Sequence, residues 1–311
     1  MKLVFMGRPD YAVNTLEALI SAGHNVAAVF AQPDKPVGRK HIITAPPVKV
    51  CAQSHGITVY QPNTLRDGKA GEILREIAPD VIVVVAYGKI LPKEILEIPK
   101  YGCVNGHASL LPKYRGASPI QWCIVCGEKE TGVTAMLMDE GMDTGDILKT
   151  VETEIGAEET AEELFERLSG ITAELLVNTL AELEKGNIIP IKQEEEKASY
   201  APIIKKEMAQ LDFKNMTATE IHNAVRGYYS WPCAYFFLEG KRVKVIKAAV
   251  AGNTGARAGT VIKSDDSLVI ACKDGTAVEL VTVQPEGSKP MTAKQMLCGR
   301  PIAQGTVIGC E

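Results

Sequence analysis

The chain has 311 residues, of which 46% are hydrophobic, and a net charge of −4. This length favours two domains, and this hydrophobic content excludes wholesale disorder. No apolar run reaches about 18 residues and no signal-peptide layout opens the chain, so we expect a cytoplasmic protein without a membrane partner.

The charges are unevenly distributed along the chain. Residues 1–189 carry 18 Lys and Arg against 25 Asp and Glu, whereas residues 190–311 carry 16 against 13. A mildly basic second part on an acidic protein suits a polyanionic partner that touches one side. Such an asymmetry is common, so it does not identify a partner by itself.

The first half alternates short apolar runs with helical patterns. The runs lie at residues 3–6, 26–30 and 81–86, and the helical patterns at 12–22, 48–55 and 70–77. Strands that are apolar along their whole length are typical of parallel sheets covered on both faces. We therefore predict an α/β fold with a doubly wound, Rossmann-like sheet, which residues 133–138 and 147–153 extend.

The turn after the first strand argues against a dinucleotide cofactor. A single glycine, Gly7, is followed by Arg8 and then Pro9, where dinucleotide-binding proteins place several glycines. Those glycines allow the backbone to approach the pyrophosphate closely. We expect no nicotinamide and no flavin.

The eight cysteines are scattered through apolar segments instead of forming a compact disulfide framework. Cys123 and Cys126 form one CxxC, but no second pair or nearby histidine completes a zinc site. We expect both to pack in a buried helix over residues 120–126, and we expect no metal.

The next predicted strand, at residues 101–108, is short and buried and ends in polar residues. Asn105 and His107 share one face of that strand and Gly106 faces the other way, because side chains alternate. An amide donor beside an imidazole suits a developing oxyanion. Asp143, from a separate loop, can orient the imidazole or stabilise its charged form. Each residue alone is as easily structural, and Asp143 among glycines can simply cap a turn.

The second half begins with a long helix that opens at Thr160, with Glu163 completing a capping box and Gly186 ending the helix. Residues 190–206 form an acidic, Lys-rich and Pro-containing segment, which favours a solvated linker. A short helix then starts at Thr217, and short strands follow at 235–238, 242–248, 268–271 and 278–283. Strands at this spacing predict a small barrel.

Three stretches carry a resemblance to a known family. They are Asn105-x-His107, the run Ser-Leu-Leu-Pro-Lys-Tyr-Arg-Gly at 109–116, and Gly-Met-Asp-Thr-Gly-Asp at 141–146. Together they resemble the folate-dependent formyltransferases. Segments 5–13, 32–39, 84–92 and 200–203 narrow this resemblance to the members that formylate methionyl-tRNA, and the resemblance runs nearly from end to end.

The resemblance implies an activity and a domain plan. The formyl group of 10-formyltetrahydrofolate, a co-substrate, passes to the α-amino group of methionyl initiator tRNA, which gives N-formylmethionyl-tRNA for translation initiation. The implied catalytic residues are Asn105, His107 and Asp143. We expect a catalytic domain at 1–189, a linker at 190–206 and an OB-like tRNA-binding domain at 207–311, in a monomeric protein.

The same resemblance implies the binding residues. Folate is expected to contact Tyr87, Gly88, Lys89, Ile90 and Leu91, with Ser109, Leu110, Leu111 and Pro112 alongside. Initiator tRNA is expected to contact Lys35, Arg39, Lys40 and His41, with Lys205 and Lys206 as a second surface. Cations there attract phosphates, and an arginine can also stack on an unpaired base.

Three alternatives remain at this point. A sugar-nucleotide or other amine formyltransferase shares the catalytic residues but lacks the basic loop and the basic barrel. A formyltetrahydrofolate hydrolase passes the formyl group to water. A non-catalytic RNA-binding protein belongs to a different class. An observation of folate-dependent turnover would exclude this alternative.

Overall fold

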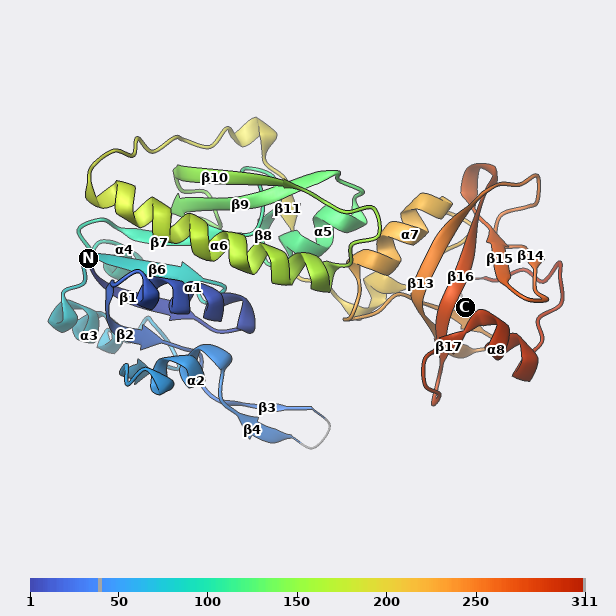
Figure 1. Ribbon diagram of the computed structural model, residues 1–311, viewed down its shortest axis with the longest axis horizontal. Coiled ribbons are helices and arrows are strands. Elements are labelled where there is room, and N and C mark those ends of the chain that lie inside the picture. The colour runs from blue at the N-terminus through green and yellow to red at the C-terminus, as the bar shows by residue number, and fades with distance from the viewer. Residues whose placement is uncertain (39–40, 310–311) are drawn as a thin grey trace. The chain divides into compact units, whose positions relative to one another are not determined.

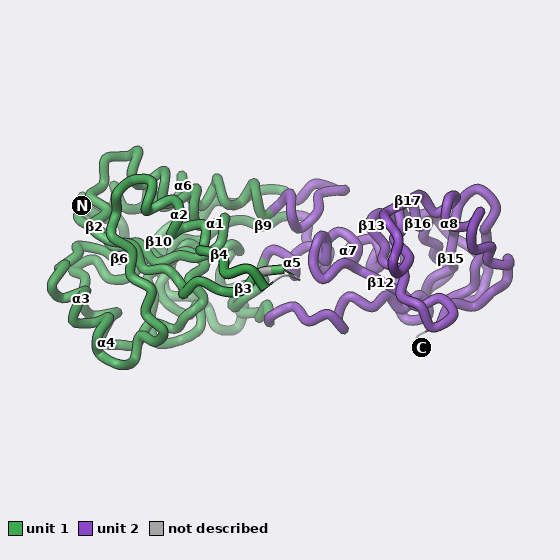
Figure 2. Tube along the Cα trace, turned by 90° about the horizontal axis from the view of Figure 1, so that it is seen from below, with its two compact units in different colours: residues 1–119, 130–154, 165–202 green, residues 120–129, 155–164, 203–311 purple. Residues whose placement is uncertain are grey.

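The computed structural model describes residues 1–38 and 41–309 (Figure 1). The chain forms two compact units, which are coloured separately in Figure 2. Unit 1 comprises residues 1–119, 130–154 and 165–202, and unit 2 comprises residues 120–129, 155–164 and 203–311. Within the described ranges, no helix combines the length and the apolar character that crossing a membrane requires.

A seven-stranded sheet in the order β10-β9-β7-β6-β1-β2-β5 organises unit 1. Its strands are β1 Lys2–Gly7, β2 Asn25–Phe30, β5 Val59–Tyr60, β6 Val81–Val85, β7 Cys103–His107, β9 Glu130–Leu137 and β10 Ile147–Glu154. Strands β1, β2, β5, β6 and β7 are parallel, whereas β9 runs antiparallel to both β7 and β10. The predicted α/β sheet is confirmed, with β9, which runs against the other strands, and then β10 added at one edge.

Helices cover both faces of this sheet (Figure 1). They are α1 Asp10–Ser21, α2 Pro47–Ser54, α3 Lys69–Ile77, α4 Lys93–Leu96 and α6 Ala161–Glu184. Helix α6 lies against α1, where the Tyr11 hydroxyl is 2.6 Å from the Thr172 hydroxyl. Helix α6 also begins as predicted, because Thr160 and Glu163 exchange the hydrogen bonds of a capping box.

The two faces of β7 meet different neighbours. On one face a Cβ at Gly106 would lie 2.7 Å from the Thr172 methyl and 2.9 Å from Leu176, so α6 packs directly on the backbone there. The other face continues the core that Leu74 of α3 and Ile95 of α4 form with the even-numbered residues of β1 and β6. Asn105 and His107 therefore point away from α6.

Unit 1 also contains two short strand pairs that the sequence did not predict. Strand β3 Lys35–Val37 pairs with β4 Ile42–Thr44 as an antiparallel hairpin. Strand β8 Arg115–Gly116 pairs in parallel with β11 Tyr200–Ala201. The second pair joins the loop after His107 to the segment that was predicted to be a linker.

Unit 2 is built on an antiparallel sheet in the order β12-β13-β16-β15-β14, with β17 paired to β16. Its elements are α5 Pro119–Val125, α7 Ala218–Gly227, β12 Tyr235–Leu238, β13 Lys241–Asn253, β14 Val261–Lys263, β15 Leu268–Ala271, β16 Thr276–Pro285, β17 Met291–Thr292 and α8 Ala293–Gly299. Short 3-10 turns occur at Lys206–Ala209 and Lys273–Gly275 in this unit, and at Glu195–Lys197 in unit 1. The OB-like prediction is confirmed as an antiparallel half-barrel. The CxxC prediction is half right, because Cys123 is buried and Cys126 is exposed.

Burial of His222 on α7 predicts a pH dependence of unit 2. Burial is the main cause that lowers the pKa of His222 below its ordinary 6.5, and Arg226 adds to it while Glu158 opposes it. The unfolded chain therefore binds the proton more readily, so the stability that neutral His222 contributes is complete above pH 6.5 and is lost as the pH falls. We expect urea midpoints at pH 7.5 and 5.0 to differ less in His222→Gln than in the wild type.

Tryptophan fluorescence is the measurement for this prediction. Both tryptophans, Trp122 and Trp231, belong to unit 2, so their emission follows this unit. Equal pH sensitivity in the two proteins would contradict the prediction.

Candidate active site

The strand end that carries Asn105 and His107 lies at the carboxyl edge of the parallel strands. The loops that leave β1, β6 and β7 meet at this edge, because these strands are parallel neighbours. Asn105 is 9% exposed and His107 is 6% exposed, so both side chains are shielded from bulk water. The strand therefore presents an amide and an imidazole side by side in a protected site.

The hydrogen bond at one nitrogen of His107 determines how its ring can act. His107 Nε2 lies 2.9 Å from the backbone oxygen of Tyr114. A carbonyl oxygen can only accept, so Nε2 carries a proton and donates it. The other nitrogen, Nδ1, faces Asp143 with 3.7 Å between Nδ1 and Oδ2. That nitrogen is the one that can exchange a proton with a substrate or a water.

Hydrogen bonds hold Asp143 both at its carboxylate and at its backbone carbonyl oxygen. Its Oδ2 accepts a 2.8 Å hydrogen bond from the Gly116 amide, and its own φ is 55°, in the left-handed region. Its carbonyl oxygen and that of Gly145 each accept a 2.8 Å bond from Gln193 Nε2. The carboxylate is thereby aimed at His107, as expected from the sequence.

The path of Asp143 to His107 is set by the direction of β9. Strand β9 is antiparallel to β7, and Leu137 at its end pairs with Val104. Val104 lies three residues before His107 on β7. At about 3.3 Å per residue, the loop after β9 therefore starts about 10 Å away from His107. It must fold back over the sheet to bring Asp143 to His107.

The Asn105 amide is free for a ligand. Across residues 1–38 and 41–309, no hydrogen bond to a protein group engages its side chain. A buried amide usually has such partners. The polar atoms of Asn105 are not among the described side-chain atoms that are sealed from water, so water or a ligand can reach them. Asn105 therefore offers two N–H donors beside His107, in the arrangement that suits an oxyanion.

The loop predicted to bind folate presents its backbone more than its side chains. Tyr87 and Leu91 are 1% and 2% exposed and belong to the core, and burial raises the pKa of Tyr87 to about 12. Gln32 Nε2 donates to the carbonyl oxygens of Tyr87 and Gly88 at 2.8 Å and 3.2 Å. Ile90 is 66% exposed, so it is the apolar side chain that this loop offers to a ligand.

Lys89 is already engaged by the protein. Its ammonium donates to the carbonyl oxygens of Pro62 and Asn63. Burial lowers the pKa of Lys89, and the charge of Lys35 lowers it further. Contact between Lys89 and the folate tail therefore requires these two hydrogen bonds to be exchanged, and it stays a prediction.

The Ser109–Pro112 segment is fixed from within. Ser109 is fully buried, and its hydroxyl donates to the Lys113 carbonyl oxygen at 2.7 Å. The Thr134 hydroxyl donates to Ser109 O and accepts from the Leu111 amide. Leu110 is half-buried, and the Leu111–Pro112 peptide is cis. This segment is therefore a rigid wall beside Asn105 and His107, and it does not offer the Ser109 hydroxyl to a ligand.

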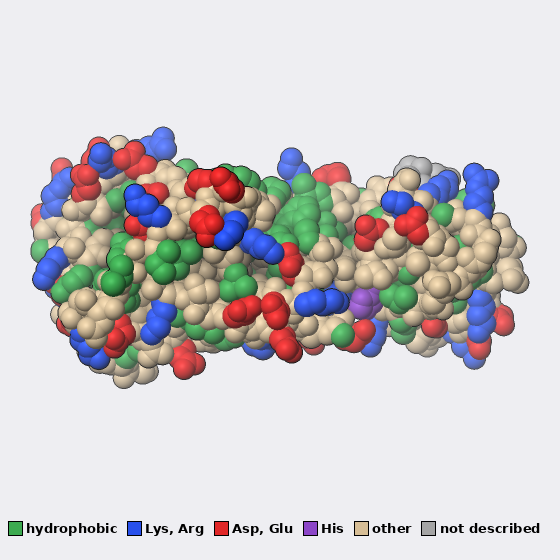
Figure 3. Space-filling model, turned by 90° about the horizontal axis from the view of Figure 1, so that it is seen from above, with side chains coloured by type: hydrophobic (Ala, Val, Ile, Leu, Met, Phe, Trp, Pro, Cys, Tyr) green, Lys and Arg blue, Asp and Glu red, His purple; other side chains and the backbone are tan. Residues whose placement is uncertain are grey.

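The residues predicted to contact tRNA lie mainly on exposed parts of the chain. Lys35 and His41 belong to the β3–β4 hairpin region, and Ile42 and Ile43 beside them are 61% and 67% exposed. Arg39 and Lys40 lie outside the described residues. Lys205 and Lys206 are exposed in unit 2. On the face drawn in Figure 3, basic and acidic side chains are interspersed, so no large area of one sign appears there.

The segment predicted to be a solvated linker is joined to the active site. Gln193 bonds to the Asp143 loop, and Ser199 Oγ accepts from the Tyr114 amide at 2.9 Å. Ser199 O accepts from the Arg115 amide at 2.8 Å. A plain connector does not describe residues 193–201. Sequence reasoning also missed Arg115, because a charged residue is expected at the surface.

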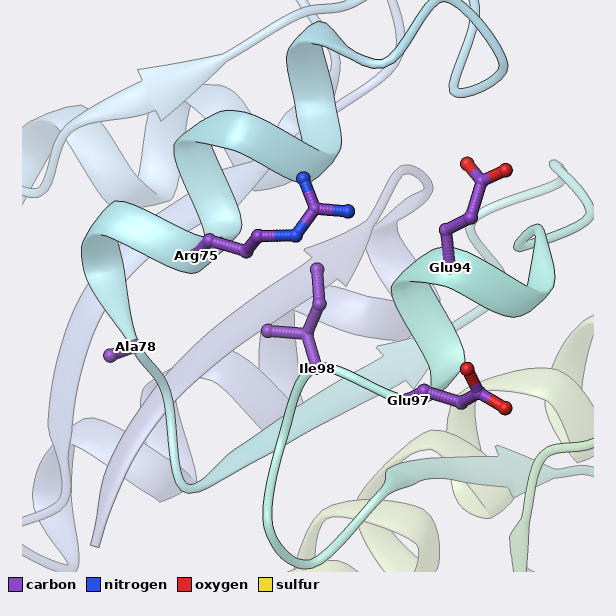
Figure 4. Close-up of a pocket in the computed structure, with 5 residues that line it drawn as sticks. All are labelled: Arg75, Ala78, Glu94, Glu97 and Ile98. Carbon is purple, nitrogen blue, oxygen red and sulfur yellow. The ribbon is translucent and has the colours of Figure 1, made fainter.

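Two other features of unit 1 lie away from this site. A hollow of about 440 Å³ is lined by Arg75, Ala78, Glu94, Glu97 and Ile98 (Figure 4). Its residues lie in or just after α3 and α4, which precede β6 and β7, so it lies at the amino edge of the sheet. Glu17, Cys51 and His55 form the one group of potential metal ligands among the described residues. Burial raises the pKa of Cys51 to about 12, and its thiol donates to Glu17.

The Asp143 loop depends on a glycine that no other residue can replace without movement. A Cβ at Gly145 would lie 1.8 Å from the Leu137 carbonyl oxygen, which is backbone and cannot rotate away. We expect Gly145→Ala to lower the free energy of unfolding by about 1–3 kcal/mol and to lower kcat, because the loop must shift. Urea unfolding and turnover measure the two effects.

Gly170→Ala is the matched control for this substitution. No atom lies within 4 Å of a Cβ at Gly170, which is in helix α6. Alanine there is expected to stabilise the helix by up to about 1 kcal/mol without changing kcat. Equal effects of the two substitutions would contradict a special role for Gly145.

The fold and this site together define an α/β group-transfer enzyme, and comparison with known proteins identifies the class. The family described as "Formyl transferase" matches residues 1–180, and "Formyl transferase, C-terminal domain" matches residues 203–301. The chain belongs to the formyl transferase family.

Close relatives are methionyl-tRNA formyltransferases. That of Caldanaerobacter subterraneus subsp. tengcongensis is 46% identical over 310 residues, which cover 99% of this chain and 100% of the relative. That of Thermodesulfovibrio yellowstonii is 48% identical over 303 residues, 97% of each chain.

Solved structures share the fold at lower identity. An N-formyltransferase from Helicobacter canadensis, in complex with folinic acid and dTDP-3-aminofucose, has a TM-score of 0.68 at 21% identity and covers 92% of this chain and 99% of its own. The methionyl-tRNA formyltransferase from Clostridium thermocellum has a TM-score of 0.54 at 22% identity and covers 80% and 93%.

Proposed function

We propose that this chain transfers the formyl group of 10-formyltetrahydrofolate to the α-amino group of methionyl initiator tRNA. The observation that carries the activity is the unpartnered Asn105 amide beside His107, with Asp143 at 3.7 Å from the imidazole. The substrate pair follows from the likeness to methionyl-tRNA formyltransferases over 99% of the chain.

The proposed mechanism assigns one task to each catalytic residue. The substrate amine attacks the formyl carbon, and the carbonyl electron pair moves onto oxygen, where Asn105 donates a hydrogen bond to the resulting oxyanion. Asp143, directly or through a water, takes the proton that the attacking nitrogen loses. His107 exchanges a proton at Nδ1 while Tyr114 holds the Nε2 side of its ring. The carbonyl then re-forms, and the folate nitrogen leaves with a proton.

The folate donor fits the carboxyl edge beside these residues. Gly88 and Ile90 present an open peptide edge and an apolar side chain after β6, and the rigid Ser109–Pro112 wall stands after β7. A flat heterocycle is bound by such surfaces through backbone hydrogen bonds and stacking contacts. Tyr87 and Leu91 contribute main-chain groups, because their side chains are buried in the core.

The tRNA surface is proposed to begin at the β3–β4 hairpin. Lys35, Arg39, Lys40 and His41 provide cations for the acceptor end, and Lys205 and Lys206 add a second surface. Residues 1–189 serve as the catalytic domain, 190–206 as the connection and 207–311 as the tRNA-binding domain. Because aminoacyl-tRNA is the acceptor, the protein acts in the cytoplasm, and one chain carries the whole site as a monomer.

The experiment is formyl transfer from 10-formyltetrahydrofolate to methionyl-tRNA, with initiator and elongator tRNA compared. We expect transfer to the initiator, weaker in Arg39→Ala and increasingly weak as salt rises. Folate deformylation without a tRNA product would favour the hydrolase, and transfer to an amino sugar nucleotide would favour a sugar formyltransferase. Tight RNA binding without any formyl turnover would overturn the enzyme assignment.

A further inference from the structure

The largest fully buried side chain in the described part of the molecule is a charged one, Arg115, at 0% exposure. A buried guanidinium is costly unless its N–H groups have partners. Gln193 and Glu195 provide most of them, and the Tyr200 side chain forms a further hydrogen bond with the guanidinium. Gln193 Oε1 accepts from Nε at 3.0 Å and from Nη2 at 2.8 Å, and the Glu195 carboxylate accepts from Nη1 and Nη2 at 2.9 Å and 2.8 Å. Such paired, charge-assisted bonds fix the orientation of the arginine.

Both neighbours of Arg115 touch the catalytic residues. The Tyr114 carbonyl oxygen accepts from His107 Nε2, and the Gly116 amide donates to Asp143 Oδ2. In β8, the Gly116 amide therefore binds Asp143, while the Arg115 side chain is held by Gln193 and Glu195. A shift of β8 would move the contacts of His107 and of Asp143 together.

Gln193 closes a second connection to the same loop. While its oxygen accepts from Arg115, its amide nitrogen donates to the carbonyl oxygens of Asp143 and Gly145. One side chain thus joins the guanidinium to the loop that carries the catalytic carboxylate. The rest of the segment reinforces this arrangement, because Ser199 and β11 bond to residues 112–118.

We propose that Arg115, Gln193 and Glu195 are positioning residues for formyl transfer, which hold His107 and Asp143 at reacting distance through β8 and the Asp143 loop. The segment 193–201 is then part of the catalytic machinery. That the reaction is formyl transfer rests on the proposed function. The positions of His107 and Asp143 do not depend on which reaction the site performs.

Gln193→Glu is the sharpest variant. A glutamate keeps the shape and the acceptor for Arg115, so the fold is retained. It replaces the amide donor with a carboxylate oxygen that repels the carbonyl oxygens of Asp143 and Gly145. We expect kcat to fall by about 10- to 100-fold, the size of effect that a misplacement of about 1 Å can have. KM for the folate should change less than about threefold.

Gln53→Glu is the matched control. Gln53 is exposed on α2, and the substitution makes the same change in charge in unit 1. It is expected to match the wild type in kcat and in urea midpoint. Glu195→Gln gives the second test, since its exposed side chain tolerates substitution. It removes the charge that pairs with Arg115, and we expect a smaller loss of kcat in the same direction.

A readout without substrate separates this proposal from the proposed function. The chain has only five histidines, so ¹⁵N-labelled imidazole signals can be assigned. We expect the His107 ring signals to move in Gln193→Glu, with those of His222 unchanged. If the wild type fails to formylate tRNA, the proposed function is wrong. The His107 signals of Gln193→Glu still test whether Gln193 positions His107.

The positioning role is overturned by either of two results. One is a Gln193→Glu protein with wild-type kcat and superimposable His107 signals. The other is a kcat loss that matches the loss of folded protein, with His107 unchanged in the folded fraction. If Gln193→Glu does not fold, the same two readouts on Glu195→Gln decide.

Discussion

His107→Ala is expected to lower kcat for formyl transfer by about 10²–10⁴-fold, the usual contribution of a positioned proton-transfer group. The structure gives the reason. Nε2 is committed to the Tyr114 carbonyl oxygen, so Nδ1 is the nitrogen that can exchange a proton with the substrate, and Asp143 faces it at 3.7 Å. Alanine removes that nitrogen and leaves Asp143 without the imidazole that it faces, although Asp143 keeps the hydrogen bond from the Gly116 amide. Single-turnover rates with methionyl-tRNA measure the effect on the chemical step.

His55→Ala is the matched control, because His55 is the C-cap residue of α2, outside the residues that form the site. It should keep the wild-type rate, while the urea midpoint of His107→Ala stays near that of the wild type. A folded His107→Ala protein within about threefold of the wild-type rate would contradict a role in proton transfer.

The sequence was informative wherever a local pattern determines the structure. Thr160 with Glu163 predicted the start of α6, and the alternation at 105–107 predicted which side chains share a face. Both depend on residues a few positions apart, whose geometry the backbone dictates.

Strand direction was not available from the sequence. An apolar run such as residues 133–138 looks the same whether it runs parallel or antiparallel to its neighbour. The direction of β9 depends on the edge of the sheet at which the preceding segment returns to it. That edge is set by the tertiary fold. The sequence therefore predicted that Asp143 faces His107, but not that its loop leaves an antiparallel strand.

The role of residues 193–201 was hidden for a different reason. Glutamates, lysines and prolines in a row are typical of exposed connectors, and Glu195 is indeed largely exposed, at 69%. Its partner Arg115 lies 80 residues earlier in the chain. Only the fold reveals that the charged residue of a loop is buried and that the exposed segment supplies its acceptors.

Asn105→Ala is expected to lower kcat by about 10²–10³-fold, or roughly 3–4 kcal/mol of transition-state stabilisation, as for other single oxyanion donors. The oxyanion develops only after attack, so KM for either substrate should change little. Asn105→Asp keeps the shape but places a carboxylate where negative charge develops, and its loss should be at least as large. Asn178→Ala, on the exposed side of α6, is the matched control.

Stability distinguishes this role from a structural one. An asparagine that holds the fold has hydrogen-bond partners, and losing them lowers the free energy of unfolding. The Asn105 amide has no hydrogen-bond partner among the described protein groups, and its polar atoms are not among those sealed from water, so its removal costs the fold no hydrogen bond. We expect Asn105→Ala to unfold at a urea concentration close to that of the wild type, with its activity lost. A destabilised Asn105→Ala protein with little loss of kcat would instead make Asn105 a structural residue, and the oxyanion donor would have to be sought elsewhere.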